Sequence, residues 1–246
     1  MIRLALIGNP VEHSASPALH RGFLEEAGMD GEYVAIRVAS GDGARVIRRL
    51  RADGFTGCNV TYPLKEEAFE ACDARTDESE RIEAVNTILF GRETLGTTTD
   101  GAGARSAIEA VLDEPVALKR VGILGYGATA RAILSVLQEN DAYTFVWGRD
   151  EARVIETCRR FEAKPWPGSN PPEIVVSTLP PEAALPDDLI AQLQNADMVM
   201  DANYGDRSRL ARRLNREVIP GDAMLEAQAR ASFDFWLAHI DRVGGG

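Results

Sequence analysis

Short apolar runs alternate with longer amphipathic runs along the chain, and this alternation is the pattern of an α/β protein. An apolar run of about five residues has the length of a buried strand, and apolar positions three and four apart mark one face of a helix. In the first half of the chain the pattern predicts strands at residues 3–7, 33–38, 55–60, 82–90 and 94–97, and helices at 17–27, 44–52, 65–72 and 104–112. Strands that alternate with helices predict a mostly parallel sheet covered by helices.

A second alternation of strands and helices begins near Arg120. It predicts strands at residues 121–124, 143–147, 174–177 and 198–201, and helices at 129–138, 151–161 and 223–240. The preceding helix ends near Pro115, so we expect the boundary between two α/β domains within residues 102–134. The pattern alone leaves open which of the two domains the last helix packs against.

Composition narrows the class of protein. The 246 residues are 45% hydrophobic and 26% charged, which is ordinary for a folded globular chain. A net charge of −11 argues against general affinity for nucleic acid or an anionic membrane. The three cysteines have no paired spacing, and the first apolar run is too short for a signal peptide or a membrane span. We therefore expect a cytoplasmic protein without disulfide bonds.

The segment VGILGYGATARAIL places a glycine-rich turn between a predicted strand and a predicted helix. Gly125, Gly127 and Ala130 match the pattern G-x-G-x-x-A. In that pattern the first glycine makes the turn, the second lets a pyrophosphate approach the backbone, and the small third residue lets the helix pack on the strand. We expect a dinucleotide site here, and the alternative is a tight turn without a ligand.

The tip of the next strand indicates which dinucleotide binds. A carboxylate at this position usually holds the ribose hydroxyls of NAD, whereas an arginine accommodates the additional phosphate of NADP. Here Gly148 occupies the tip, Arg149 follows it, and Arg153 lies one helical turn further on. The sequence favours NADP, and NAD stays the alternative because Asp150 could bond a ribose.

Small polar residues stand where several predicted strands end, and in an open parallel sheet this edge binds ligands. They are Ser14 and Ser16, Asn59 and Thr61, Asn86, and Asp100, with Lys65 at a strand-to-helix junction. Plainer explanations exist, since Ser16 suits a helix N-cap and Asp100-Gly101 suits a turn.

The histidines and possible metal ligands add little to this picture. His20 and His239 lie among apolar helical positions and are expected to be structural, while His13 lies near the polar loop and is a candidate contact. No cluster of histidine, cysteine or carboxylate residues has the spacing of metal ligands. We therefore expect no metal.

Several segments together resemble the shikimate dehydrogenase family over nearly the whole chain. They are GNPVEHSASP, NVTYPLKEEAF, AVNTI, the TDG of TTTDG, the glycine-rich turn and GDAMLEAQA. The resemblance implies an enzyme that reversibly reduces 3-dehydroshikimate with NADPH in a cleft between two domains. It implies a substrate-binding domain from residues 1–102 and 222–246, and a Rossmann-like NADP-binding domain from residues 103–221.

The resemblance also implies roles for single residues. Lys65 and Asp100 match the family's catalytic pair, which manages the proton of the C3 hydroxyl; Lys65 would act either as a base or as a charged stabiliser of the alkoxide. Ser14 and Ser16 would bind the substrate carboxylate. The other substrate contacts would be Asn59, Thr61, Asn86, Tyr204 and Gln228. The cofactor contacts would be Gly125, Tyr126, Gly127, Ala128, Thr129, Arg149, Arg153, Thr178, Gly221 and Met224.

The chain departs from the family pattern mainly on the cofactor side. Tyr126 and Ala128 stand where alanine and glycine are common, Gly148-Arg149-Asp150 replaces N-R-T or N-R-S, and Thr97-Thr98 precedes TDG where the family usually has D-N. Two alternatives therefore stay open. One is a quinate/shikimate or aminoshikimate dehydrogenase with relaxed use of NAD and NADP, and the other is a catalytically silent sensor of a shikimate-type ligand. We expect a small-molecule partner and no nucleic acid or membrane partner. Both a monomer and a homodimer are compatible with the sequence.

Overall fold

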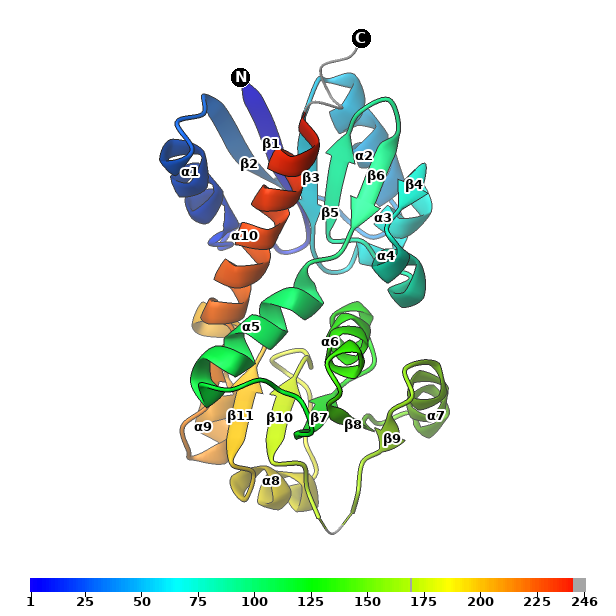
Figure 1. Cartoon of the computed structure of the whole chain (residues 1–246), viewed down its shortest axis with the longest axis vertical. Helices are drawn as coiled ribbons and strands as arrows, with labels where there is room; N and C mark the ends of the chain where they lie inside the picture. Colours follow the sequence, from blue (N-terminus) through cyan, green and yellow to red (C-terminus); the bar gives the residue numbers. More distant parts are fainter. Residues whose placement is uncertain (169, 241–246) are drawn as a thin grey trace. The chain divides into compact units, whose positions relative to one another are not determined.

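The computed structural model describes residues 1–168 and 170–240, which divide into two compact units (Figure 1). The first unit comprises residues 1–99 and the chain from Gln228 onward, and the second comprises residues 100–227. The first unit contains β1 (Ile2–Gly8), α1 (Ser16–Glu26), β2 (Gly31–Arg37), α2 (Gly43–Ala52), β3 (Gly57–Val60), α3 (Lys65–Ala71), β4 (Ala74–Arg75), α4 (Asp77–Ile82), β5 (Thr87–Phe90) and β6 (Thr94–Thr97). The second unit contains α5 (Asp100–Leu112), β7 (Arg120–Leu124), α6 (Ala128–Glu139), β8 (Tyr143–Trp147), α7 (Glu151–Arg160), β9 (Lys164–Pro165), β10 (Ile174–Ser177), α8 (Asp187–Gln194), β11 (Met198–Asp201), the 3-10 turn η1 (Gly205–Arg207), α9 (Leu210–Leu214) and β12 (Ile219–Pro220).

The last helix, α10 (Asp222–His239), begins in the second unit and ends in the first. It confirms the amphipathic helix predicted at 223–240 to within one residue. Among the residues that the structure describes, no helix combines the length and the apolar character needed to cross a membrane.

The sheet of the first unit is mixed. Over the described residues its six strands have the order β2-β1-β3-β5-β6-β4. β1 pairs parallel with β2 and β3, whereas β5 runs antiparallel to both β3 and β6. A three-residue turn at residues 91–93 joins β5 to β6, and a connection this short permits only an antiparallel pair. The predicted parallel pairing therefore holds for β2-β1-β3 and for β4 with β6, and β5 makes the two antiparallel pairs.

The sheet of the second unit is the Rossmann-like one. Over the described residues its six strands have the order β12-β11-β10-β7-β8-β9, and every pairing between them is parallel. The four strands predicted in this half of the chain are confirmed to within one residue. β10 lies beside β7, so the chain crosses over the sheet after β9, as strand order in doubly wound folds requires.

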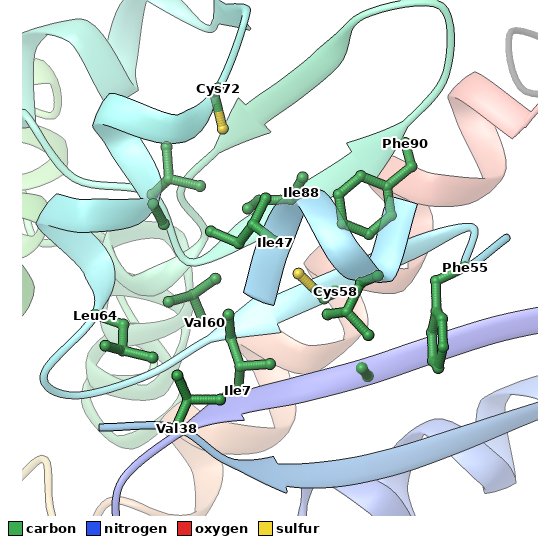
Figure 2. Packing of buried hydrophobic residues seen from close by; sticks show 14 residues of the cluster. Ile7, Val38, Ile47, Phe55, Cys58, Val60, Leu64, Cys72, Ile88 and Phe90 are labelled. Carbon is green, nitrogen blue, oxygen red and sulfur yellow. The ribbon is translucent and has the colours of Figure 1, made fainter. Parts of the chain in front are cut away.

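Alternating side chains of the first sheet build two separate cores. Ala5 and Ile7 point to one face, where Ile47 of α2 and Leu64, the N-cap residue of α3, are among the residues that cover them (Figure 2). Leu4 and Leu6 point to the opposite face, which residues of α1 and α10 cover. The period of two along a strand explains why one strand serves both cores.

One predicted element is wrong in part. The apolar residues between 82 and 90 predicted a single strand, but the structure has α4 over Asp77–Ile82 and β5 over Thr87–Phe90. The side chain of Thr76 caps α4 by accepting a hydrogen bond from the backbone N–H of Ser79. Acidic residues in the first turn complement the helix dipole, and Glu83 ends the helix in the left-handed conformation at φ 55°. These local signals decide against the strand.

His20 is a buried residue of α1, and its ring lies in the core that α1 and α10 cover. Its ring stacks on that of Tyr33 with centroids 4.4 Å apart, and the rings of Phe233 and Trp236 lie 6.4 and 5.3 Å away. Burial, with a smaller contribution from the positive Arg230, lowers the pKa of His20 from its usual 6.5 to about 3. His20 is therefore neutral and structural in the folded protein.

This burial makes stability depend on pH. Below about pH 6.5 the unfolded chain binds a proton at His20 that the folded protein does not accept, so the free energy of unfolding falls as the pH decreases toward the folded pKa of about 3. The contribution of His20 approaches at most about 1.4 kcal/mol per pH unit. We expect His20→Phe to flatten this dependence in urea unfolding between about pH 7 and about pH 5. The exposed His13, changed to Gln, is the control and should leave the dependence unchanged; equal slopes in H20F and the parent protein would contradict the prediction.

Candidate functional site

The glycine-rich turn lies between β7 and α6. Its two glycines differ in whether the surrounding structure leaves room for a side chain. Gly125 has φ +117°, and a Cβ there would lie 2.5 Å from the hydroxyl oxygen of Thr178. Gly127 has φ −75°, and no atom of the described chain lies within 4 Å of the place where its Cβ would be. The fold itself therefore requires Gly125 but not Gly127, whose open space lies before the first N–H groups of α6. This arrangement fits a phosphate group of a dinucleotide.

Asp100 is held beside this turn. It is buried at the start of α5, and its Oδ2 accepts a hydrogen bond from the hydroxyl of Thr129, in the first turn of α6, at 3.2 Å. The close approach of α5 and α6 depends on Gly101, since a Cβ there would lie 2.4 Å from the carbonyl oxygen of Ala132. Asp100 is thus part of a helix start, and its carboxylate has a fixed neighbour in the first turn of α6.

Asp150 has a structural role. It is the N-cap of α7, and its Oδ1 accepts a hydrogen bond from the backbone N–H of Arg153 at 3.2 Å. The guanidinium carbon of Arg153 lies 5.3 Å from the centroid of the Tyr126 ring. The carboxylate that could have favoured NAD is therefore explained by the helix that it caps.

The remaining residues expected to contact the cofactor also lie in the second unit. Thr178 follows β10 and donates its hydroxyl to the carbonyl oxygen of Leu124 at 2.9 Å. Gly221 follows β12, where a Cβ would lie 2.6 Å from the carbonyl oxygen of Ala202, and Met224 is buried in the first turn of α10. All of these residues follow strands of the all-parallel sheet, at its carboxyl edge.

Lys65 begins α3, directly after the loop that leaves β3. Its carbonyl oxygen accepts a hydrogen bond from the N–H of Val85 at 3.0 Å, and the neighbouring Leu64 is fully buried. Glu67 accepts hydrogen bonds from the N–H groups of Gly41 and Gly43 at 2.7 and 2.8 Å. These three anchors close to one another in the chain fix the backbone that carries the lysine.

Ser14 and Ser16 form a hydroxyl pair. Their Oγ atoms lie 3.2 Å apart, and the N–H of Ser16 donates to the Oγ of Ser14 at 3.3 Å. Ala15 is the N-cap of α1 and makes no side-chain capping bond. The interpretation of Ser16 as a helix cap is therefore wrong. Thr61 stands after β3, where its N–H donates to the carbonyl oxygen of Ile7 at 2.9 Å.

Asn59 is buried on β3, and protein groups bond both ends of its side-chain amide. The hydroxyl of Tyr33 donates to Oδ1 at 2.8 Å. Nδ2 donates to the hydroxyl oxygens of Thr87 and Ser232, each at 3.0 Å, and lies 3.2 Å from the carbonyl oxygen of Asn86. An amide NH2 group has two hydrogens, so these acceptors use its whole donor capacity.

Asn86 and Gln228 meet within the first unit. Oδ1 of Asn86 accepts hydrogen bonds from the N–H of Thr99 at 3.0 Å and from the hydroxyl of Thr87 at 2.8 Å. Its Nδ2 donates to Thr99 Oγ1 at 3.0 Å and to Gln228 Oε1 at 3.4 Å. The structure thus brings the expected residues of β3, of the segment before β5 and of α10 into one hydrogen-bonded group.

Tyr204 belongs to the second unit, as Asp100 does. It stands in the segment after β11, which the buried Asp201 organises. Oδ1 of Asp201 accepts from the N–H and the side-chain amide of Asn203 at 3.0 and 2.8 Å, and its Oδ2 accepts from Ser208 Oγ at 3.3 Å. Both carboxylate oxygens therefore hold the segment that carries Tyr204.

The three cysteines take no part in this chemistry. Cys58, Cys72 and Cys158 are buried free thiols. Burial raises the pKa of each, to about 12 for Cys72 and to about 11 for Cys158. A thiol needs its thiolate to act as a nucleophile, so none of the three is suited to that role.

Sequence reasoning missed the hydroxyls that bond the amides and the carboxylate that orders the segment after β11. They are Tyr33, Thr87, Thr99, Ser232 and Asp201. One signal was available for Ser232, which falls one turn after Gln228 on the apolar stripe of Ala229, Phe233 and Trp236. A serine at an apolar position needs a polar partner.

Comparison with known proteins gives this arrangement a family. The model of the shikimate dehydrogenase substrate binding domain matches residues 6–88. The shikimate dehydrogenase (NADP(+)) of Acidiphilium cryptum is 40% identical over 161 residues, which cover 65% of this chain and 58% of that protein. The chain is therefore similar to members of the shikimate dehydrogenase family.

Further members of the shikimate dehydrogenase family match over different lengths. The shikimate dehydrogenase (NADP(+)) of Methanosarcina acetivorans is 39% identical over 168 residues, covering 66% of this chain and 59% of that protein. The matched part thus spans less than two thirds of the length of these curated relatives. The crystal structure of shikimate 5-dehydrogenase from Thermus thermophilus, in complex with NADP(H) and shikimate, matches over 97% of this chain and 94% of its own, with 28% identity and a TM-score of 0.84.

Two departures from the family pattern prove to be a single packing unit. Tyr126 stands where this family commonly has alanine, and Gly148 stands where it commonly has asparagine. A Cβ at position 148 would lie 2.5 Å from Cε1 and 2.6 Å from Cδ1 of the Tyr126 ring. The ring therefore fills the space that a side chain at position 148 would need, so Tyr126 in this position requires a glycine at 148.

This packing predicts strong coupling between positions 126 and 148. We expect Gly148→Ala alone to cost about 1–3 kcal/mol, because the new methyl group overlaps the ring of Tyr126. Tyr126→Ala should remove most of that cost, so a double-mutant cycle in urea unfolding should show a coupling of about 1 kcal/mol or more. Additive effects would contradict the packing. Gly127→Ala is the matched control: its methyl group enters open space and should leave stability within about 1 kcal/mol of the parent.

Proposed function

We propose that the protein is a shikimate dehydrogenase that reversibly reduces 3-dehydroshikimate to shikimate with NADPH. The observation that carries the proposal is the placement of the two residues that match the family's catalytic pair. Lys65 stands on a helix start with three backbone and side-chain anchors, and Asp100 is bonded to Thr129 at the dinucleotide turn. The names of the curated relatives and the NADP(H) and shikimate bound to the Thermus thermophilus enzyme support it.

In the oxidative direction, the chain's own residues bind the substrate and manage one proton. NADP+, when bound, accepts the hydride from C3 of shikimate. We propose that Ser14 and Ser16 donate hydrogen bonds to the substrate carboxylate, and that Lys65 with Asp100 takes up the proton that the C3 hydroxyl loses as the hydride departs. The ring hydroxyls would be held by Thr61, Asn86, Tyr204 and Gln228. Asn59, the other expected contact, already has both ends of its amide bonded to protein groups.

On the cofactor side, we propose NADP rather than NAD. Gly127 leaves room for a pyrophosphate before α6, and the first turn of that helix supplies N–H groups to it. Arg149 and Arg153 would pair with the additional phosphate, since an arginine fork matches phosphate oxygens. Other proposed contacts are Gly125, Tyr126, Ala128, Thr129, Thr178, Gly221 and Met224. Residues 1–102 and 222–246 would then bind the substrate and residues 103–221 the NADP.

A spectrophotometric assay tests this function. Purified protein is mixed with shikimate and either NADP+ or NAD+, and the appearance of reduced nicotinamide is followed by its absorbance. We expect turnover with shikimate and NADP+, and much slower turnover with NAD+. Quinate in place of shikimate tests the substrate. Faster turnover of quinate or equal use of NAD+ would instead support the relaxed relative, and shikimate binding without any NADP+ reduction would support the silent sensor.

A further inference from the structure

A single buried hydroxyl joins the polar groups that the first unit offers to its ligand. Ser232 Oγ lies 3.0 Å from Asn59 Nδ2, 2.8 Å from Thr87 Oγ1 and 3.1 Å from Thr99 Oγ1, and it donates to the carbonyl oxygen of Gln228 at 2.9 Å. Its residue has no exposed surface. A hydroxyl has one hydrogen and two lone pairs, so three of these four contacts already use everything that Ser232 can offer.

The partners of Ser232 in turn orient the other amides. Thr87 donates to Oδ1 of Asn86 at 2.8 Å, and the N–H of Thr99 donates to the same oxygen at 3.0 Å. Two donors on Oδ1 fix which way the amide of Asn86 faces, because the alternative rotamer would set its NH2 group against these N–H and O–H donors. Thr99 Oγ1 also lies 3.4 Å from Gln228 Oε1, so the same group of hydroxyls contacts the side-chain amides of both Asn86 and Gln228.

Asn59 differs from Asn86 and Gln228 in this arrangement. Its oxygen accepts from Tyr33, its NH2 group is spent on Thr87, Ser232 and a backbone carbonyl, and its residue is 7% exposed. An amide that breaks such bonds to reach a ligand leaves buried donors and acceptors without partners, which costs about 1–3 kcal/mol for each group. The side chain of Asn59 therefore supports the neighbouring polar side chains and does not itself contact the ligand.

We infer that Ser232 is a positioning residue for the proposed reaction, and that Asn59 belongs to the same supporting layer rather than to the ligand-contacting one. Ser232 connects α10 to β3, β5 and the segment after β6, and it holds the side chains of Asn86 and Gln228 in the orientation that receives the ring hydroxyls. The inference rests on the proposed function for its substrate, whereas the orientation of the amides follows from the first unit alone. A site whose polar groups are held in place before binding loses less entropy when the ligand arrives.

The test compares Ser232→Ala with a matched serine of the same unit. Removal of the hydroxyl should lower kcat/KM for shikimate about tenfold or more, since displaced positioning groups are costly, while the KM for NADP+ stays within about twofold. Ser79→Ala is the control. Ser79 is equally buried, and its hydroxyl bonds the capping side chain of Thr76 at 3.1 Å, so this variant should lose stability without changing kcat/KM for shikimate. Wild-type kinetics in S232A, or an equal loss in S79A, would overturn the inference.

A second variant guards against a folding defect in S232A. Thr87→Val keeps the shape of the side chain and removes its hydroxyl, so it should lower kcat/KM for shikimate as S232A does, and the double variant should lose less than the product of the two single losses. Multiplicative losses would show that the two hydroxyls act independently and would overturn the inference.

A readout without catalysis separates this inference from the proposed function. In nuclear magnetic resonance spectra, the side-chain NH2 protons of Asn59 should exchange slowly with water in the parent protein and at least about tenfold faster in S232A, because a buried bonded amide exchanges only on opening. Should the parent protein fail to oxidise shikimate, the proposed function fails while slow exchange still upholds the positioning layer. Equal exchange in the two proteins would overturn the layer even in an active enzyme.

Discussion

Lys65→Ala is expected to lower kcat for shikimate oxidation by at least about a hundredfold, the low end for loss of a general acid–base group. The C3 hydroxyl must lose a proton as the hydride leaves, and removal of the ammonium group leaves Asp100 without its proposed partner in that transfer. The backbone anchors of Lys65 are a carbonyl bond to Val85 and the buried neighbour Leu64, which the substitution keeps. Turnover should therefore fall while the fold and the KM for NADP+ persist, as steady-state kinetics at saturating NADP+ would show.

Two comparisons sharpen this prediction. Lys164→Ala removes an exposed lysine from β9 and should leave kcat unchanged. In the parent enzyme, a base role makes kcat rise with pH until the lysine is deprotonated, whereas a permanently charged lysine gives a profile without that rise. Near-normal turnover in K65A would remove Lys65 from the chemistry.

Trp236→Ala is expected to destabilise the first unit by about 3–5 kcal/mol, the usual cost of deleting a large buried aromatic side chain. Trp236 is 2% exposed and packs with Leu4, Leu6 and Phe233. Its indole N–H donates to the carbonyl oxygen of Ile88 at 2.9 Å. A Cβ on Gly57 would lie 2.6 Å from the same nitrogen, so the ring sits directly against β3 with no room to spare.

Trp236→Phe divides this cost into its parts. The phenyl ring keeps most of the apolar contact, and the lost hydrogen bond should account for about 1 kcal/mol. Urea unfolding followed by far-ultraviolet circular dichroism measures both variants, with Trp166→Phe as the control. Trp166 lies in the second unit, where its indole N–H donates to Gln192 Oε1 at 2.7 Å, so its loss should leave the first-unit transition in place. A first-unit midpoint in W236A equal to that of the parent would contradict the packing role.

The elements that the sequence predicted well are those whose sequence signal is local or periodic. The strands at 143–147 and 198–201 are short, largely apolar runs, and their limits agree with the structure. The antiparallel pairing of β5 with β3 was not readable, because it joins residues far apart in the chain, whereas the antiparallel pair of β5 and β6 follows from the short turn between them. α4 was missed because the apolar spacing around Ile82 outweighed the cap at Thr76.

The candidate site divides in the same way. Gly125, Gly127 and Ala130 could be read from a contiguous motif, and the structure shows that the fold requires Gly125 and leaves open space at Gly127. Ser232 and Thr87 could not, because their hydroxyls meet across 145 positions of the chain. A short motif specifies the conformation of its own backbone. A tertiary hydrogen bond joins two distant segments, and the sequence of neither segment predicts it alone.

The path of α10 sets an order of assembly during synthesis on the ribosome. The second unit is interposed between Thr99 and Gln228 of the first, so its chain is complete before the last helical turns exist. Until Ala229, Phe233 and Trp236 have been translated, Leu4 and Leu6 lack the part of their cover that α10 provides. The first unit is therefore the first to be started and the last to be completed during translation. This part of its apolar face stays exposed in the interval, and exposed apolar surface is what chaperones bind.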